Sequence, residues 1–200
     1  METILIAGIL IFLLSSVFFL LTYRRAFNTA ALVSLVTIAS YIVMLEGTFA
    51  TVSADGEAVL YTRWLFYALS CSLLMYEIGR SLKFSKEEIA TIIYLINIVM
   101  ITGALSAVFT EGYMLAMFVV STIAYAVLVY KLFKAKSKNR NFVLRYIAFG
   151  WTIFPIVFIV APEGYGLITA AAAAGAYLLL DILTKIVFYI DGDGSKSIKV

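Results

Sequence analysis

Asp181 and Lys185 are the two residues whose types and spacing most strongly suggest chemistry. They lie four positions apart in the segment 169–190, TAAAAAGAYLLLDILTKIVFYI, which is otherwise apolar enough to cross a bilayer. A spacing of four places both side chains on one face of a helix. Because a charge at membrane depth is costly unless it is paired, such residues often mark a functional site.

Two interpretations of this pair remain open. In the first, Asp181 and Lys185 form a plain ion pair that faces the interior of a helix bundle. In the second, the lysine nitrogen is covalently occupied. Lysine amines form Schiff bases with carbonyl compounds, and a buried protonated Schiff base needs a carboxylate counterion beside it.

A second group of candidate residues lies in the apolar segment 58–80. On a helix, one stripe of this segment contains Arg63, Phe66, Tyr67, Ser70, Leu74 and Glu77. This face carries a cation at one end and a carboxyl at the other, with Ser70 and Cys71 between them. Phe66 and Glu77 are about 16 Å apart at a rise of about 1.5 Å per residue. The alternative is that Arg63 extends to the membrane surface and that Glu77 is solvated at the helix end.

The composition indicates which elements position these residues. The chain has 200 residues, of which 64% are hydrophobic and 14% charged, and its mean hydropathy is +1.03. These values exclude an ordinary soluble domain. Apolar runs of about 20 residues predict membrane-spanning helices at 3–22, 29–49, 58–80, 88–109, 112–134, 142–161 and 165–190. We therefore expect an all-α, multi-pass protein of the cell membrane, with residues 1–200 forming one seven-helix domain in the lipid bilayer.

The distribution of cations predicts the orientation of this bundle. Alternate connections and the C-terminal tail hold Arg24, Arg25, Arg80, Lys83, Lys86, Lys131, Lys134, Lys136, Lys138, Arg140, Arg145, Lys196 and Lys199. The other connections, EGTFATVSADGEA, TEG and APEGYG, contain no Lys or Arg. By the positive-inside rule the N-terminus lies outside and the C-terminus in the cytoplasm. The net charge of +3 therefore reflects topology and gives no reason to expect nucleic acid.

Several kinds of site are disfavoured. The chain has no His and one cysteine, Cys71, so we expect neither a metal centre nor an internal disulfide. It has no Gly-rich phosphate loop and no strong candidate for a nucleophile triad. We therefore do not expect an enzyme.

Two further features concern the walls of the bundle. In the sixth span, Trp151, Phe154, Pro155 and Phe158 fall on one side of a helix that the proline bends. Such a stripe is usually core, but it would also form a slot for a flat apolar ligand. In the fourth and fifth spans, the small, polar or adaptable residues are of the kind that line cavities or join membrane helices, and for most of them we favour the second role; they are Asn97, Met100, Thr102, Ser121, Thr122 and Tyr125.

Together these residues resemble the microbial rhodopsins, the retinal-binding family that includes bacteriorhodopsin. The resemblance rests on seven helices, the DxxxK pair, the sixth-helix pattern W-x-x-[YF]-P and a short following loop with EG, and it covers nearly the whole chain. It implies that all-trans retinal is a Schiff base on Lys185, with Asp181 as counterion and Tyr41 bonded to Asp181. It also implies a homotrimer. The pocket that it implies comprises Tyr67, Met100, Ala104, Thr122, Trp151, Phe154, Pro155 and Phe158.

Within that family, the third span resembles the schizorhodopsins, whose family activity is light-driven inward proton transport. The resemblance rests on Phe66, Ser70 and Glu77, with Cys71 beside the serine. Outward pumps of the family carry an aspartate where this chain has Phe66. Their outer carboxylate pair is also broken here, since Glu163 is present but its partner position is Ala173.

Charge counting also favours inward transport. Asp181 alone balances Arg63 and Lys185, which leaves about one positive charge in excess. We expect the proton to leave toward Glu77 by a short water path past Ser70 and Cys71. The lysine nitrogen would then regain a proton from outside, through the region of Asp181 and Arg63.

Two alternatives to an inward pump remain. A photosensor of the same family would use the same pocket and signal through a separate partner. A retinal-free seven-helix transporter or scaffold would use Asp181 and Lys185 only as an ion pair.

Overall fold

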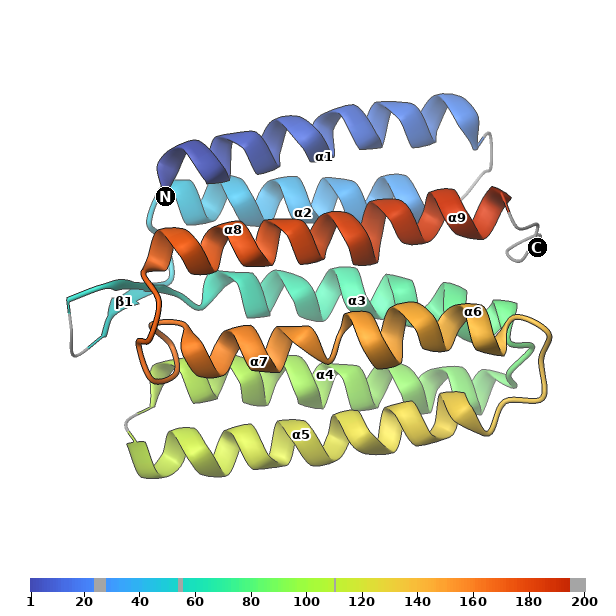
Figure 1. Cartoon of the computed structure of the whole chain (residues 1–200). Helices are drawn as coiled ribbons and strands as arrows, with labels where there is room; N and C mark the ends of the chain where they lie inside the picture. The colour runs from blue at the N-terminus through green and yellow to red at the C-terminus, as the bar shows by residue number, and fades with distance from the viewer. Residues whose placement is uncertain (24–27, 54–55, 110, 195–200) are drawn as a thin grey trace.

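The computed structural model is a bundle of seven helical rods that lie side by side (Figure 1). It describes residues 1–23, 28–53, 56–109 and 111–194, so Arg24, Arg25, Lys196 and Lys199 lie outside the described part. Five rods are single helices: α1 (Glu2–Thr22), α2 (Thr29–Leu45), α3 (Thr62–Ser81), α4 (Lys86–Val108) and α5 (Glu111–Phe133). The predicted seven-helix bundle is confirmed.

The last two rods are composite. The sixth rod consists of α6 (Arg140–Leu144), the π-helical segment η1 (Arg145–Gly150) and α7 (Ile153–Val160). The seventh rod consists of α8 (Ala170–Asp181), the π-helical segment η2 (Ile182–Val187) and α9 (Phe188–Gly194). Isolated π segments within helices often mark functional positions.

Within the described residues, five helical stretches are long and apolar enough to cross a membrane. They are Glu2–Thr22, Lys86–Val108, Gly112–Phe133, Arg140–Val160 and Ala170–Gly192. Helix α2 is also apolar but, with 17 residues, is shorter. Helix α3 is more polar because it carries Arg63, Glu77 and Arg80.

Side-chain caps fix where three rods begin. Asn28 Oδ1 accepts a hydrogen bond from the Ala31 amide at the start of α2, and Thr169 Oγ1 accepts one from Ala172 at the start of α8. At the start of α4, Ser85 and Glu88 form a reciprocal capping box. These bonds satisfy amide donors that have no partner within the helix.

Helices that follow one another in the sequence are neighbours from α1 to α5, and α8 closes the bundle by packing against α1 and α7. Polar contacts also join neighbouring rods, for example between α4 and its neighbours α3 and α5. Asn97 Nδ2 donates to Ser72 Oγ over 2.7 Å, and Ser121 Oγ donates to the Val99 carbonyl over 3.0 Å. Asn97 and Ser121 thus join helices, as their small polar side chains predict.

The predicted start of the third span at residue 58 is wrong. Residues 58–60 form strand β2 (Ala58–Leu60), which pairs antiparallel with β1 (Ala50–Val52), and the helix begins at Thr62. The hairpin is anchored to the seventh rod, because Glu57 Oε2 accepts a hydrogen bond from the Ala170 amide over 3.1 Å. A carboxylate is favoured there by the positive end of a helix dipole.

Two other predicted boundaries extend too far. The second span ends at Leu45, four residues before its predicted end at 49, and Gly47 and Phe49 have positive φ angles of 70° and 55°. The seventh begins at Ala170 and not at 165, and Gly166 has φ of 64°. Left-handed backbone of this kind is incompatible with a continuing right-handed helix.

The bundle has two distinct ends (Figure 1). We call the end that carries Met1, the β1–β2 hairpin and residues 161–169 the hairpin end. The opposite end carries the connections 82–85 and 134–139. Helix α3 runs from the first end to the second, so Arg63 lies near the hairpin end and Glu77 near the opposite end.

Candidate functional site

The Asp181–Lys185 pair is buried at the junction of α8 and η2. Lys185 Nζ lies 2.8 Å from Asp181 Oδ1, and the two side chains are 4% and 0% exposed. Helix α2 supplies the other polar contacts. Tyr41 donates its hydroxyl hydrogen to Asp181 Oδ2 over 3.1 Å, and Lys185 Nζ donates to Thr37 Oγ1 over 3.3 Å. The structure thus brings Tyr41 to Asp181, as the sequence comparison with microbial rhodopsins implied.

Helix α1 holds Tyr41 against this pair. Gly8 packs directly on the tyrosine ring, and a Cβ atom at Gly8 would lie 2.6 Å from Tyr41 Cε1. Since real Cβ atoms do not approach so closely, only glycine permits this packing. The ring of Phe12 also stacks on Tyr41, with centroids 6.2 Å apart. Tyr41 therefore has little freedom to turn away from Asp181.

Replacing Tyr41 with phenylalanine should destabilise the protein by about 1.5 to 3 kcal/mol, the usual contribution of a hydrogen bond to a charged group. The carboxylate would keep Lys185 but lose the donor to Oδ2. Thermal unfolding in detergent would measure the difference. Tyr94→Phe is the matched control, because Tyr94 is 68% exposed. Equal unfolding temperatures for the two variants would show that the Tyr41 bond contributes nothing.

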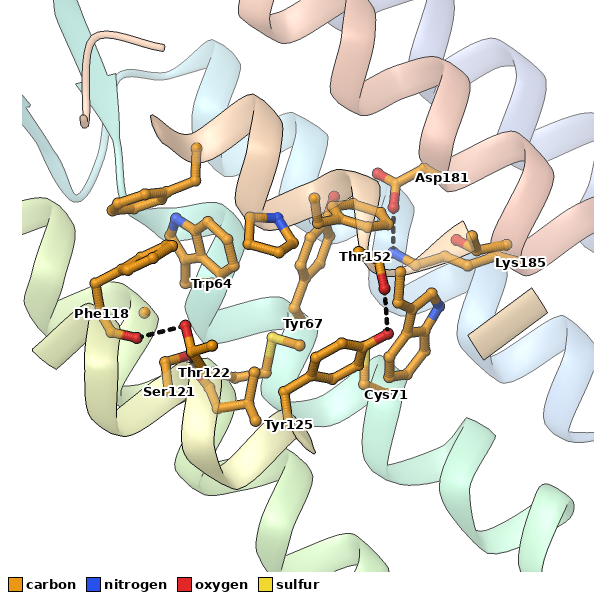
Figure 2. Close-up of a pocket in the computed structure, with 18 residues that line it drawn as sticks. Trp64, Tyr67, Cys71, Phe118, Ser121, Thr122, Tyr125, Thr152, Asp181 and Lys185 are labelled. Atoms are coloured by element: carbon orange, nitrogen blue, oxygen red, sulfur yellow. Dashed lines mark hydrogen bonds and ion pairs between the residues drawn. The ribbon is translucent and has the colours of Figure 1, made fainter. Parts of the chain in front are cut away.

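A cavity of about 210 Å³ lies beside Lys185, and Figure 2 shows its lining side chains. Its lining includes the predicted pocket residues Tyr67, Met100, Thr122, Trp151, Phe154, Pro155 and Phe158, together with Cys71, Asp181 and Lys185. It also includes Trp64, Val99, Gly103, Phe118, Ser121, Tyr125, Thr152 and Thr184. The walls are mainly aromatic and aliphatic, with the ion pair as their charged part.

The structure places one predicted pocket residue differently. Ala104 is buried on α4 but is not among the residues that line the cavity, whereas its neighbour Gly103 is. A Cβ atom at Gly103 would lie 3.1 Å from Trp64 Cε3, so the missing side chain makes room for the indole. The cavity is therefore lined on this turn of α4 by Gly103, one residue before the Ala104 that the resemblance implied.

Perpendicular aromatic contacts define the shape of the cavity. The Tyr67 ring meets Trp64 and Phe154 at centroid distances of 6.0 and 5.7 Å, and Trp64 meets Phe158 at 5.5 Å. Lys185 Nζ lies 4.2 Å from the centroid of Tyr67. Edge-to-face packing of this kind is favourable and restricts ring rotation. The cavity is therefore a preformed apolar slot with an amine at its wall.

Two π segments meet beside the amine. Segments η1 and η2 contact each other, and a Cβ atom at Gly150 would lie 3.2 Å from Thr184 Cγ2. The sequence predicts a bend at Pro155, but the helical pattern already changes at Arg145 and is interrupted by a turn at Trp151 and Thr152. Neither π segment was predicted.

On the hairpin side of the ion pair, Arg63 is also buried, with 4% of its surface exposed. Its guanidinium carbon lies 4.0 Å from the ring centroid of Tyr177, which is a cation–π contact. The Tyr177 hydroxyl donates to Glu163 Oε1 over 2.7 Å. Tyr177 thus connects Arg63 with Glu163, while Ala173 is simply buried.

Sequence reasoning missed Tyr177 and Thr37, although both carry a simple signal. Tyr177 precedes Asp181 by four positions and Thr37 precedes Tyr41 by four. Residues at this spacing share a helical face. A search for polar groups one turn from each predicted site residue would therefore have found both.

On the opposite side, Ser70 and Glu77 are buried in α3 with 1% and 7% of their surfaces exposed. Cys71 lines the cavity, and Glu77 lies six residues beyond it, or about 9 Å along the helix axis. Phe66 is partly exposed and is not part of the cavity lining. Arg63 and Glu77 are thus both buried, which excludes the alternative that they extend into solvent.

Comparison with known proteins provides independent information about the family. The family model described as bacteriorhodopsin-like protein matches residues 1–190. Sensory rhodopsin-2 of Natronomonas pharaonis is 24% identical over 176 residues, which cover 82% of this chain and 73% of that protein.

Solved structures have the same fold. The crystal structure of schizorhodopsin 4 is similar over 100% of this chain and 99% of its own, with a TM-score of 0.92 and 33% identity. Halorhodopsin, a light-driven chloride pump, is similar over 100% of this chain and 98% of its own, with a TM-score of 0.87 and 19% identity. Proteins of different activity thus share this fold, so the activity of each depends on the side chains of its site.

Proposed function

The chain belongs to the bacteriorhodopsin-like family, and on that premise we propose that it is a light-driven pump that moves protons into the cell. Members of the family bind retinal through a Schiff base to a lysine, so retinal is the cofactor. A retinal-free scaffold is thereby disfavoured. The family comprises light-driven transporters and sensors, which are not enzymes in the ordinary sense.

Lys185 is the proposed attachment site for retinal. Its amine reaches the wall of a 210 Å³ cavity whose other walls are mainly apolar, and Asp181 lies beside it to balance a positive charge. These features fit a long apolar aldehyde. When bound, retinal would supply absorption of visible light and an isomerisation that changes how the lysine nitrogen presents its proton. The protein must then decide where that proton goes.

The hairpin end is proposed to face the outside of the cell membrane. Several cations of the described part lie toward the opposite end: Arg80, Lys86 and Lys131 in the helix turns at that end, and Lys83 and Lys134 in the connections 82–85 and 134–139. Lys and Arg accumulate on the cytoplasmic side of membrane proteins. Glu77 then lies on the cytoplasmic side of Lys185, and Arg63 on the outer side.

The observation that carries the inward direction is the charge balance around Lys185. Among the described residues, Asp181 is the one carboxylate in an ion pair with Lys185. Phe66 occupies the position at which outward pumps of this family carry their proton acceptor. In the described part of the chain, the outer side therefore supplies no second carboxylate in contact with the amine, and Asp181 is already bonded by Tyr41 and Lys185.

Glu77 is the proposed destination on the inner side. It is a buried carboxyl in the same helix as Ser70 and Cys71, which lie between it and the level of Lys185. About 9 Å of helix separates Cys71 from Glu77, which is too long for one direct transfer. The proton therefore requires a short water path past these side chains. The Glu77 carboxylate at the end of this path attracts the proton, whether or not Glu77 itself becomes protonated.

Recovery of the proton is proposed to occur from the outer side. Glu163, Tyr177 and Arg63 form a connected series from the hairpin end toward Asp181. Glu163 is only partly buried and is therefore in contact with the medium. Once Lys185 Nζ has lost its proton, the Asp181 carboxylate would take up a proton from this side and pass it to Lys185 Nζ, which lies 2.8 Å away.

Illumination of cells in weakly buffered medium tests this proposal. We expect the external pH to rise in light and the change to disappear when a protonophore is added. Acidification of the medium would contradict inward pumping. A coloured protein that causes no pH change would favour the photosensor, for which the similarity to sensory rhodopsin-2 is the supporting observation.

Residues 1–200 are proposed to act as one domain, and a homotrimer is the assembly that the family resemblance implies. Membrane-facing apolar surface is available for such contacts, since Leu14, Leu21 and Ile123 are among the exposed apolar side chains. The mass of the purified protein in detergent distinguishes a trimer from a monomer.

A further inference from the structure

The cavity beside Lys185 reaches the lateral surface of the bundle. Thr122 of α5 and Thr152, which lies between η1 and α7, both line the cavity. Both are also exposed on the outside of the protein. Since the cavity is not fully enclosed, side chains that both line it and are exposed mark the place where it opens. This opening faces the apolar part of the membrane, because both residues lie within membrane-spanning stretches.

The opening lies where two rods pack weakly. Helix α5 is held mainly by α4, and it meets the sixth rod chiefly through α6, away from the turn at Thr152. Only 11% of the most apolar stretch of α5 is buried, compared with 50% for the seventh rod. The sixth rod is irregular at this level, because η1 ends at Gly150 and Pro155 lacks an amide donor.

One hydroxyl group joins the two rods at the opening. Tyr125 of α5 donates to the Ile147 carbonyl over 2.6 Å, and its oxygen lies 3.1 Å from Thr152 Oγ1. Figure 2 shows this contact as a dashed line at the edge of the cavity. Because the Tyr125 hydrogen goes to Ile147, Thr152 is the donor in the contact with Tyr125, and the Ala148 carbonyl of its own rod is the alternative acceptor for the same Thr152 hydrogen. Tyr125 and Thr152 thus form a polar latch in an otherwise apolar seam.

We infer that this seam, bordered by Thr122, Tyr125 and Thr152, is the portal through which retinal loads into the folded protein from the bilayer. Retinal is apolar and concentrates in the membrane. At the hairpin side the cavity is closed by Trp64 and Phe158, which pack edge to face at 5.5 Å. To open the lateral seam, only the Tyr125 hydroxyl and small side chains have to move. The inference rests on the proposed function insofar as retinal is the ligand of this cavity.

The rate of pigment formation tests the portal. The protein is produced without retinal and purified, all-trans retinal is added, and the growth of visible absorption is followed. Thr152→Phe should fill the seam and slow pigment formation about tenfold, which corresponds to about 1.4 kcal/mol in the barrier. Ile153→Phe is its control, because Ile153 is the next residue, is 44% exposed and does not line the cavity.

A second variant should act in the opposite direction. Tyr125→Phe removes the latch hydroxyl without adding volume, so pigment formation should become faster than in the unaltered protein. Tyr130→Phe is the control, because Tyr130 lies on the same helix and is 61% exposed. If both Thr152→Phe and Tyr125→Phe load at the unaltered rate, the portal lies elsewhere and the inference is overturned.

Supplying retinal during synthesis separates slow loading from a damaged pocket. For a portal, the pigment deficit of Thr152→Phe should shrink when retinal is present before the chain has folded. A deficit of the same size under both conditions would assign Thr152 to the pocket itself and overturn the inference. If the unaltered protein and both controls stay colourless, the retinal-binding function fails, and the portal fails with it.

Discussion

Lys185→Ala is expected to abolish the visible absorption band when retinal is supplied. The amine is the proposed attachment atom, and no other lysine lines the cavity in the described part of the chain. The substitution also leaves the Asp181 carboxylate buried without its cation, and breaking a buried ion pair costs about 3 to 5 kcal/mol. The pigment must therefore be measured together with the folded fraction.

A double variant separates the two effects. Asp181→Asn with Lys185→Ala removes both charges, so it should recover much of the stability lost in the single variant yet remain colourless. Lys131→Ala, outside the cavity on α5, should keep the pigment. A visible band in a folded Lys185→Ala protein would show that retinal is attached elsewhere.

Glu77→Gln is expected to reduce light-driven proton uptake by on the order of tenfold or more, because the amide can neither carry the charge that attracts the proton nor bind it. Pigment formation should be largely retained, since Glu77 lies outside the cavity lining. The two quantities are the initial rate of the external pH change and the visible absorbance of the same cells.

The matched control is Glu87→Gln, which removes an exposed carboxylate at the start of α4 near the same end of the bundle. It should leave proton uptake unchanged. If Glu77→Gln also transports at the unaltered rate per pigment, Glu77 has no part in the proton path.

The seven rods and the ion pair could be predicted because they depend on local pattern. Apolar runs of about 20 residues identify spans, and a spacing of four places Asp181 and Lys185 on one helical face. The aromatic stripe of the sixth span predicts a slot, and Trp151, Phe154 and Phe158 do line the cavity.

The features that were not predicted depend on contacts between distant parts of the chain. Strand β2 is apolar enough to be interpreted as the start of a span, but it pairs with β1, and the hairpin is bonded to the seventh rod through Glu57 and the Ala170 amide. The π segments η1 and η2 pack on each other at Gly150 and Thr184, and no periodicity in either segment indicates this. Thr37 becomes part of the site only because α2 packs on η2.

The charge balance also proved more complex than a count of ionisable residues. The count leaves one excess positive charge between Arg63, Lys185 and Asp181. In the structure Arg63 lies over the Tyr177 ring, and Tyr177 is bonded to Glu163. The arginine therefore has partial compensation on the outer side, away from the lysine nitrogen. Asp181 remains the carboxylate next to Lys185.

The most direct test is the sign of the light-driven current at zero applied voltage, with the same solution on both sides of the cell membrane. With no gradient present, only an active pump can move charge. We predict a current of positive charge into the cell that persists when sodium and chloride are replaced and is absent in Lys185→Ala. An outward current, or a current only when a gradient is imposed, would contradict inward proton pumping.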